Sequence, residues 1–322
     1  MTAREFDAIL RQAASAPRSL GVGCLAELLA VDDAASDEAL FAAAREVREK
    51  CGRAEVLPRG LIECSNICAK DCRYCGLRRS NAGLRRYRLS EAAALAAVAE
   101  ARHRGYPAVA FQAGELESEA NTAYYERLLA GCGGLEVTLS LGEQTEAVYR
   151  RWREAGALRY LLRIETSNRE LYARIHPAEC SFDRRLECLR TLKRLGYITG
   201  TGVMIGLPGQ TAVDLAEDIA FFGRERADMV GMGPFIPNPA TPLAVEPVME
   251  PLARLRLALR MIALVRLYLH DVNIVAATAL EALDREHGRE RGLVAGANVI
   301  MPNLTPADCR GDYDLYPGKA EA

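Results

Sequence analysis

Residues 68–75 read CAKDCRYC, a run in which three residues and then two separate Cys68, Cys72 and Cys75. A loop this short can bring three sulfur atoms to one place, and thiolates are ligands for zinc or for iron–sulfur clusters. A structural zinc ion takes four protein ligands, and no histidine or further cysteine follows at a suitable distance. The run therefore favours a [4Fe–4S] cluster with one iron left open, the alternative being buried structural cysteines. Cys64 does not share the spacing and is interpreted as a strand residue.

This run resembles the signature of the radical S-adenosylmethionine (SAM) superfamily. Tyr74 occupies the aromatic position before the third cysteine, and residues 76–79 (Gly-Leu-Arg-Arg) continue the loop. The resemblance implies that the open iron binds the amino and carboxylate groups of SAM. It also implies that one electron cleaves SAM to methionine and a 5′-deoxyadenosyl radical. We therefore expect an enzyme with a [4Fe–4S] cluster and SAM as cofactors.

Composition excludes several other classes of protein. The 322 residues are 50% apolar, and 41 basic and 43 acidic residues leave a net charge of −2, so neither a nucleic-acid nor a membrane partner is expected. The most apolar stretch, 255–269, is interrupted by Arg256, Arg260 and Arg266, which indicates a buried helix rather than a membrane span. The first residues lack the apolar segment of a signal peptide. With ten cysteines, this predicts a cytoplasmic, metal-binding protein.

Periodicity predicts an α/β fold. Apolar residues at helical spacing predict helices over 5–14, 20–30 and 37–51, which would form an N-terminal helical layer (1–50). Strands are predicted over 56–65, 108–112, 135–141, 159–165, 199–206, 229–233, 273–277 and 297–301. Helices between and after them are predicted over 90–104, 120–130, 145–155, 182–195, 211–224, 252–269 and 280–291. This alternation indicates a (β/α)8 TIM barrel over 51–305, with a C-terminal tail (306–322) closing it.

The active site of such a barrel lies at the carboxyl ends of its strands. Gly114 and Glu115 end the second predicted strand, and in radical SAM enzymes a Gly-Glu pair here lies beside the SAM ammonium group. The alternative for Glu115 is a solvated carboxylate. Thr138 faces the same side of its strand as Ser140, toward the lumen or bonded to a neighbouring strand. Arg163 and Glu165 are also two residues apart, so they could bind a zwitterion or each other.

Three later segments complete the candidate site. Arg185, near a helix start, could bind the SAM carboxylate in a bidentate manner or be solvated. Residues 202–211, including Met204, resemble the superfamily's glycine-rich strand that contacts adenine. Residues 233–237, including Pro234, would add an apolar wall beside adenine. His176 and His270 have no partner at ligand spacing and are interpreted as structural.

Longer stretches resemble the radical SAM maturases of [FeFe]-hydrogenase, the HydE family. They are 75–79, 86–88, 138–143, 160–166, 206–211, 231–237, 296–302 and 315–319. The resemblance implies a (β/α)8 barrel and a small organometallic substrate, an iron–cysteine carbonyl/cyanide complex on the way to the two-iron subcluster. The other hydrogenase maturases would be partners. It implies that Arg163, Glu165 and Arg185 hold SAM. It also implies that the cavity for SAM and substrate is lined by Thr138, Thr278, Tyr313 and Tyr316.

The chain departs from the family's pattern at three places. Leu116 replaces a frequent Asp, and Ala277 replaces the first of two threonines, which leaves the substrate open. The tail offers only Cys309 and ends at Ala322 without the cysteines of an accessory cluster, so one cluster per chain is expected. A biotin-synthase-like or methylornithine-synthase-like enzyme with another small substrate is the alternative. A zinc-stabilised scaffold is the non-enzymatic one.

Overall fold

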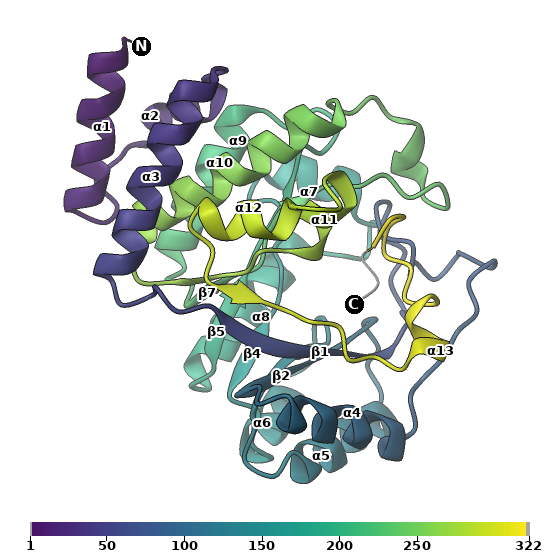
Figure 1. Ribbon diagram of the computed structural model, residues 1–322. Coiled ribbons are helices and arrows are strands. Elements are labelled where there is room, and N and C mark those ends of the chain that lie inside the picture. The colour runs from purple at the N-terminus through teal and green to yellow at the C-terminus, as the bar shows by residue number, and fades with distance from the viewer. Residues whose placement is uncertain (1, 320–322) are drawn as a thin grey trace.

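The computed structural model describes residues 2–319. Three helices come first, α1 (Ala3–Ser15), α2 (Val22–Ala30) and α3 (Ala34–Lys50). Thr2 and Glu5 form a capping box that starts α1, and the Asp33 side chain accepts a hydrogen bond from Ser36 N to start α3. Figure 1 shows these helices on one side of the molecule, where α2 packs against α9 (Ala212–Arg224) and α3 against α10 (Pro251–Leu269).

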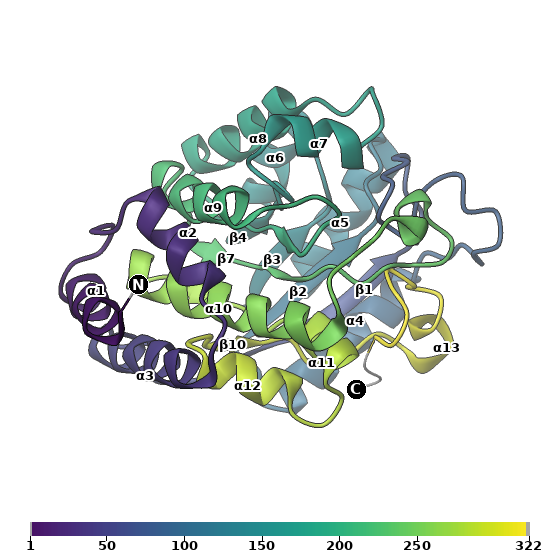
Figure 2. The same cartoon turned by 90° about the horizontal axis from the view of Figure 1, so that it is seen from above.

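The predicted (β/α)8 barrel is confirmed. Its eight strands are parallel and run in the order β10-β1-β2-β3-β4-β5-β7-β9. They are β1 (Leu57–Ser65), β2 (Ala108–Ala113), β3 (Glu136–Ser140), β4 (Arg159–Leu161), β5 (Ile198–Thr201), β7 (Met229–Val230), β9 (Asn273–Ile274) and β10 (Val299–Ile300). A bridge between Val275 and Val299 joins the two ends of the sheet. Figure 2 shows the helices arranged around these strands.

Two of the predicted strands are interrupted. The segment predicted as 199–206 is divided into β5 and β6 (Met204–Ile205), and that predicted as 229–233 into β7 and β8 (Gly233–Pro234). Between the pieces, a Cβ on Gly202 would lie 1.9 Å from the carbonyl oxygen of Gly231. The two backbones approach so closely that only glycine fits, and the regular ladder breaks there.

Most of the remaining helices come after barrel strands in the chain, as predicted. They are α4 (Glu91–His103), α5 (Glu119–Gly131), α6 (Glu146–Glu154) and α8 (Phe182–Arg194), besides α9 and α10. The single helix predicted over 280–291 is wrong. Two helices, α11 (Thr278–Leu283) and α12 (Gly288–Val294), replace it, because the chain turns so tightly that a Cβ on Gly288 would lie 2.4 Å from Leu280 O. The helices α7 (Arg169–Ile175), η1 (Pro242–Val245) and α13 (Ala307–Arg310) were not predicted.

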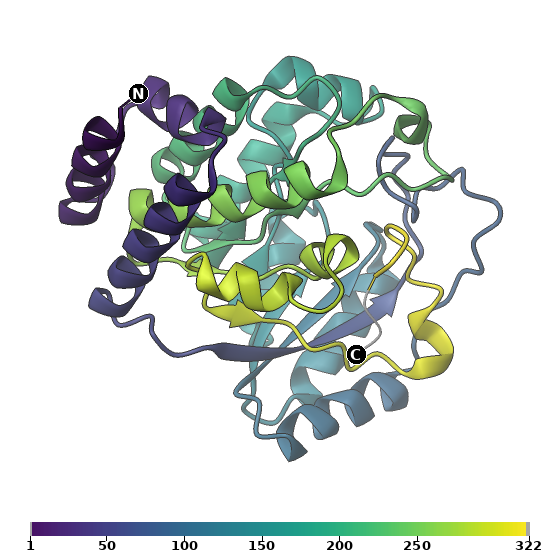
Figure 3. The ribbon, with the colours of Figure 1, turned by 45° about the horizontal axis from the view of Figure 1, so that its top comes forward.

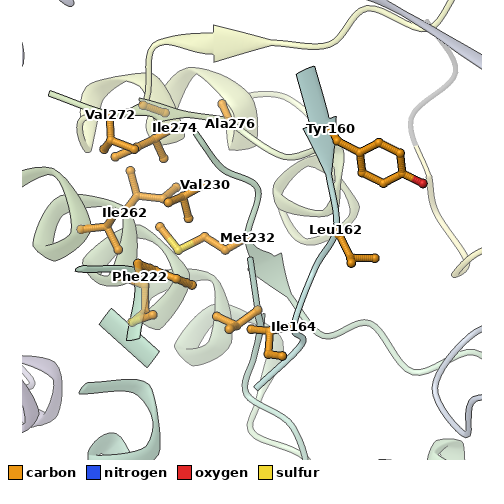
Figure 4. Close-up of a cluster of buried hydrophobic side chains, with 14 of the residues drawn as sticks. Tyr160, Leu162, Ile164, Phe222, Val230, Met232, Ile262, Val272, Ile274 and Ala276 are labelled. Carbon is orange, nitrogen blue, oxygen red and sulfur yellow. The ribbon is translucent and has the colours of Figure 1, made fainter. Parts of the chain in front are cut away.

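The barrel strands turn alternate side chains outward onto the helices. Figure 4 shows Val230, Met232 and Ile274 gathered with Phe222 of α9 and Ile262 of α10, all of them buried. By the same alternation Gly231 and Gly233 face the lumen. This packing is the core that fixes where the strand ends lie.

The helix predicted over 252–269 is buried, as expected, despite its arginines. Arg266 is fully buried and donates hydrogen bonds to the carbonyl oxygens of Gly296, His270 and Val272, and Arg260 pairs with Asp37. Backbone carbonyls and one carboxylate thus satisfy charges that burial would otherwise penalise. Among residues 2–319, no helix has both the length and the apolar character needed to cross a bilayer.

Candidate active site

One cavity of about 310 Å³ lies at the carboxyl ends of the barrel strands. Its lining contains every site residue expected from the sequence, namely Cys68, Cys72, Cys75, Gly114, Glu115, Thr138, Arg163, Glu165, Arg185, Met204, Pro234, Thr278, Tyr313 and Tyr316. The volume is within the range of small-molecule sites. A larger hollow of about 650 Å³ lies outside the barrel between α2, α9 and α10, but it contains none of these residues.

The loop that carries the three cysteines is held by backbone hydrogen bonds from three directions. Ala69 N donates to Glu115 O at 2.8 Å, Arg73 N to Ile175 O at 2.9 Å, and Gly76 N to Leu315 O at 3.1 Å. The end of β2, helix α7 and the C-terminal tail therefore all position the thiols. Figure 3 shows the tail crossing beside this loop, beyond the end of β1.

The three cysteine side chains line the same cavity. Within the described part of the chain, no three Cys, His, Asp or Glu side chains form a group that could hold one metal ion. In a [4Fe–4S] cluster each cysteine binds a different iron, so the sulfur atoms stand apart. Burial raises the pKa of Cys75 to about 12 and also raises the pKa of Cys68 and of Cys72. Because a cluster binds thiolates, its binding would displace these protons.

Cys64 does not belong to this group. It is completely buried in the apolar core, and its Sγ donates to Ile62 O at 3.6 Å. The prediction of a strand residue is therefore confirmed. Gly114, in contrast, lies directly against the cysteine loop. A Cβ there would stand 2.4 Å from Ile67 O and 2.8 Å from Cys68 Cβ, so the loop can pack on this strand end only over glycine.

Glu115 is buried and paired rather than solvated. One carboxylate oxygen lies 3.1 Å from Nζ of Lys70, and the other lies 3.7 Å from Nη2 of Arg185. Lys70 comes from within the cysteine loop, so this contact links the loop to β2. The sequence analysis did not single out Lys70. Its position between Cys68 and Cys72 was the signal available.

Arg163 and Glu165 face the cavity together. Strand β4 ends at Leu161, yet the alternation continues past it, with Leu162 and Ile164 buried in the core. Nη2 of Arg163 lies 2.9 Å from Oε2 of Glu165 and donates to Val203 O at 2.9 Å. The predicted ion pair is therefore present. Burial raises the pKa of Glu165, although Arg163 and Arg185 oppose this.

Arg185 is buried, so the alternative of a solvated arginine is wrong. Its Nε donates to Oε1 of Glu143 at 2.5 Å, and its Nη1 donates to Arg163 O at 3.2 Å. Glu143 is fully buried and was not among the predicted site residues. A signal existed, because Gly142-Glu143 after β3 repeats the Gly114-Glu115 pattern after β2.

An apolar wall lies beside the cysteine loop. It consists of Leu171, Ile175, Met204, Leu207, Phe235 and Leu243, with Tyr74 packed against it. The Tyr74 hydroxyl is 3.3 Å from Nε2 of His176, whose ring stacks on Tyr172. Burial lowers the pKa of His176 to about 3, so the imidazole is neutral. His176 therefore has a structural role, with Tyr74 and Tyr172 as its partners. His270 contacts the backbone oxygen of Ala13 at 2.8 Å, which is also a structural contact.

The C-terminal tail covers the remaining side of the cavity. The Tyr316 hydroxyl lies 2.9 Å from Oγ1 of Thr278, and Lys319 pairs with the buried carboxylate of Glu63. Neither Glu63 nor Lys319 was predicted as a site residue. Oγ1 of Thr138 is buried without a hydrogen-bond partner. An unpaired hydroxyl in the lining of the cavity suits a polar ligand.

Residues 62–222 match the model of the radical SAM superfamily. The chain is 46% identical over 301 residues to the [FeFe] hydrogenase maturase subunit HydE of Thermotoga maritima, with 92% of this chain and 83% of the relative covered.

Solved structures share the fold. A crystal structure of methylornithine synthase matches with a TM-score of 0.81 at 24% identity. The match covers 95% of this chain and 90% of the methylornithine synthase chain. A crystal structure of HydG, a maturase of the [FeFe]-hydrogenase, matches with a TM-score of 0.82 at 20% identity. The match covers 100% of this chain and 73% of the HydG chain.

Proposed function

Because the chain belongs to the radical SAM superfamily and, within it, to the HydE family of [FeFe]-hydrogenase maturases, we propose that its cavity binds SAM beside the cysteine loop and converts a small organometallic precursor. As a member of this family it is an enzyme that uses a [4Fe–4S] cluster and SAM. The observation that carries the proposal is that all residues expected to serve both cofactors line one cavity, in a chain 46% identical to a HydE protein.

Three irons of the cluster would be held by Cys68, Cys72 and Cys75. When bound, the cluster supplies one electron to SAM, which yields methionine and a 5′-deoxyadenosyl radical. The protein's own contribution is to present three thiols on a loop fastened by β2, α7 and the tail. Lys70 and Glu115 add a charged contact between that loop and the barrel.

The charged groups would orient the amino-acid end of SAM. Glu115 and Glu165 are buried carboxylates suited to an ammonium group, and Arg163 and Arg185 are suited to a carboxylate. Glu143 holds Arg185 in place through its Nε. Lys70, Arg163 and Arg185 each face one of the carboxylates of Glu115, Glu165 and Glu143, so the charges of the site balance and match a zwitterion. Met204 in the apolar wall and Pro234, which also lines the cavity, would exclude water on the adenine side.

The substrate would occupy the lumen below the tail. Thr138, Thr278, Tyr313 and Tyr316 offer hydroxyl groups there, which suit a polar iron–cysteine carbonyl/cyanide complex. We propose that the N-terminal helices (1–50) form an outer layer of the barrel (51–305) and that the tail (306–322) closes it; residues 320–322 lie outside the described part. Partners would be the other hydrogenase maturases in a reducing cytoplasm. If the substrate differs from that of other family members, Leu116 and Ala277 are the residues that would account for the difference.

Two measurements test this proposal. Anaerobically reconstituted protein with dithionite and SAM is expected to release 5′-deoxyadenosine and methionine. Added to hydrogenase apoprotein with the other two maturases, it is expected to restore hydrogen production. SAM cleavage without maturation would contradict the substrate while leaving the reaction class intact. Cleavage stimulated by lysine or dethiobiotin instead would favour the methylornithine-synthase-like or biotin-synthase-like alternative.

A further inference from the structure

Helix α9 carries a buried carboxyl group that the proposed function does not use. Asp218 is completely buried, and its Oδ1 accepts a hydrogen bond from the backbone N–H of Ser167 at 2.5 Å. Its Oδ2 is also buried and has no hydrogen-bond partner among the described residues. Burial raises the pKa of Asp218 to about 7. A buried carboxyl group with one unpaired oxygen costs stability, so the stability of the fold does not account for Asp218.

The partner of Asp218 lies close to a residue of the candidate active site. Ser167 comes two residues after Glu165, whose backbone is left-handed with φ of 68°. A residue other than glycine keeps such a conformation only when the surrounding structure fixes it. On the side of the barrel, Glu165 N donates to Gly202 O and Met204 N donates to Glu165 O, both at 3.0 Å. On the side of α9, the hydrogen bond from Ser167 to Asp218 fixes the chain.

Helix α9 also holds the next residue of this segment. Nδ2 of Asn168 donates to Oδ1 of Asp214 at 2.7 Å, and Asp214 lies one turn before Asp218 on α9. The side chain of Asn168 in addition caps the start of α7. Two carboxyl groups of one helix therefore fasten the chain between Glu165 and α7.

We propose that Asp218 is a positioning residue for SAM binding, because its carboxyl group holds Ser167 and thereby keeps Glu165 facing the cavity. The inference rests on the proposed function, in which Glu165 faces the ammonium group of SAM. Glu165 is part of the cavity lining, whereas Asp218 lies outside it. Asp218 therefore acts on the ligand only through the backbone of residues 165–167.

The hydrogen bond to Ser167 needs an acceptor atom and not a negative charge. Asp218→Asn keeps an acceptor oxygen, whereas Asp218→Ala removes it and leaves the N–H of Ser167 unpaired. The two variants therefore separate the hydrogen bond from the charge. Glu217→Ala is the matched control, because Glu217 is the adjacent residue of α9 and its side chain, 45% exposed, pairs with Arg224 at the surface.

The test uses reconstituted holoprotein, with SAM itself as the probe. Equilibrium dialysis gives the dissociation constant of SAM, and SAM cleavage with dithionite gives kcat and KM. Iron content and the thermal midpoint are measured on the same samples. We expect Asp218→Ala to raise the dissociation constant and KM about tenfold, as loss of one hydrogen bond to a charged group would, with iron content and kcat almost unchanged. Asp218→Asn and Glu217→Ala should bind SAM like the wild type.

A double-mutant cycle tests whether Asp218 acts through Glu165. In the Glu165→Gln background, Asp218→Ala should change SAM affinity by less than about twofold, because the effects of coupled residues do not add. A role in stability alone would lower the thermal midpoint of Asp218→Ala without changing the SAM affinity of the folded protein. If Asp218→Ala does not fold, Asp218→Ser, whose side chain is one bond shorter than that of Asp, replaces it under the same criteria.

The inference is overturned if Asp218→Ala binds SAM like the wild type, if Asp218→Asn binds as weakly as Asp218→Ala, or if the two changes in the cycle are additive. Unchanged affinity of Glu165→Gln would also overturn it, since Asp218 would then have no ligand group to position. Absence of SAM binding by the wild type would instead refute the proposed function, and this outcome is distinct because it does not depend on any variant.

Discussion

Arg163 and Glu165 form an ion pair of 2.9 Å at a point where Glu165 has a left-handed backbone, with φ of 68°. Few residues other than glycine adopt this conformation, which costs on the order of 1–3 kcal/mol. Strained residues of this kind cluster at functional sites. The strain occurs where β4 has ended and its inward-facing side chains enter the cavity, which Glu165 lines.

Replacing Glu165 by Gln should weaken SAM binding about tenfold, which corresponds to about 1.4 kcal/mol, because the carboxylate no longer faces the ammonium group. Equilibrium binding of SAM to reconstituted protein measures this. Glu170→Gln, at an exposed position of α7, is the control. Unchanged affinity in Glu165→Gln would assign Glu165 to structure alone.

The same variant predicts a pH dependence of stability. Burial raises the folded pKa of Glu165 above its ordinary value of 4.5, so the folded protein keeps a proton that the unfolded chain loses. The contribution of Glu165 to the free energy of unfolding therefore falls as pH rises from 4.5 through the folded pKa. The variant Glu165→Gln has no titrating group at this position. The difference between its thermal midpoint and that of the wild type should therefore shift in favour of the variant as pH rises. Parallel pH curves for the two proteins would contradict the assignment.

A methyl group at Gly142 should displace Glu115. A Cβ there would lie 2.3 Å from both Cγ and Oε2 of Glu115, and the backbone has φ of 75°. Gly105→Ala is the matched control, since its φ is 72° and nothing lies within 4 Å of the added carbon. Both variants lose roughly 1 kcal/mol of stability to backbone strain. Only Gly142→Ala should also lose SAM affinity, so equal affinities would separate Glu115 from the SAM site.

Glu143 should prove essential for placing Arg185. Glu143→Ala leaves a buried guanidinium without its nearest carboxylate, and loss of one partner of a buried pair costs about 3–5 kcal/mol. Glu117→Ala is the control, because Glu117 pairs with Arg184 at the surface, where loss of a pair costs less than about 1 kcal/mol. Urea unfolding distinguishes the two. Glu143→Gln, which keeps an acceptor oxygen, should recover part of the stability.

Iron content should identify the cluster ligands. Reconstituted wild type is expected to hold about four iron and four sulfide per chain, the content of one [4Fe–4S] cluster, and the Cys68/Cys72/Cys75 triple Ser variant almost none. Cys64→Ser should retain the iron, since Cys64 is buried away from the loop. Retention of about half the iron in the triple variant would reveal a second cluster.

Lys319 should hold the tail closed over the cavity. Lys319→Met leaves the carboxylate of Glu63, almost fully buried, without its cation. Hydrogen exchange of residues 306–319 should then accelerate, and SAM should dissociate faster. Lys319→Met should also lower the free energy of unfolding, because it leaves a buried charge unpaired. The double variant Lys319→Met/Glu63→Gln removes that charge, so it should recover part of the free energy of unfolding while hydrogen exchange stays fast. Slow exchange in both variants would mean that the other tail contacts suffice.

Spacing and periodicity predicted the cysteine loop, the barrel and cavity residues such as Thr138 and Arg163, whereas the resemblance to the HydE family implied Thr278, Tyr313 and Tyr316. The former depend on local information, because motif spacing and the alternation of strand side chains are set along the chain. Once eight parallel strands close, their carboxyl ends converge, so residues such as Thr138, Arg163 and Thr278 had to meet.

Only the tertiary structure decided how the charges pair. Glu143 with Arg185, Lys70 with Glu115 and Glu63 with Lys319 join residues 42, 45 and 256 positions apart. The break in two strands at Gly202 likewise depends on how closely Gly231 approaches it. Such contacts are set by the packing of distant segments, because a buried charge takes whichever partner the fold brings within reach.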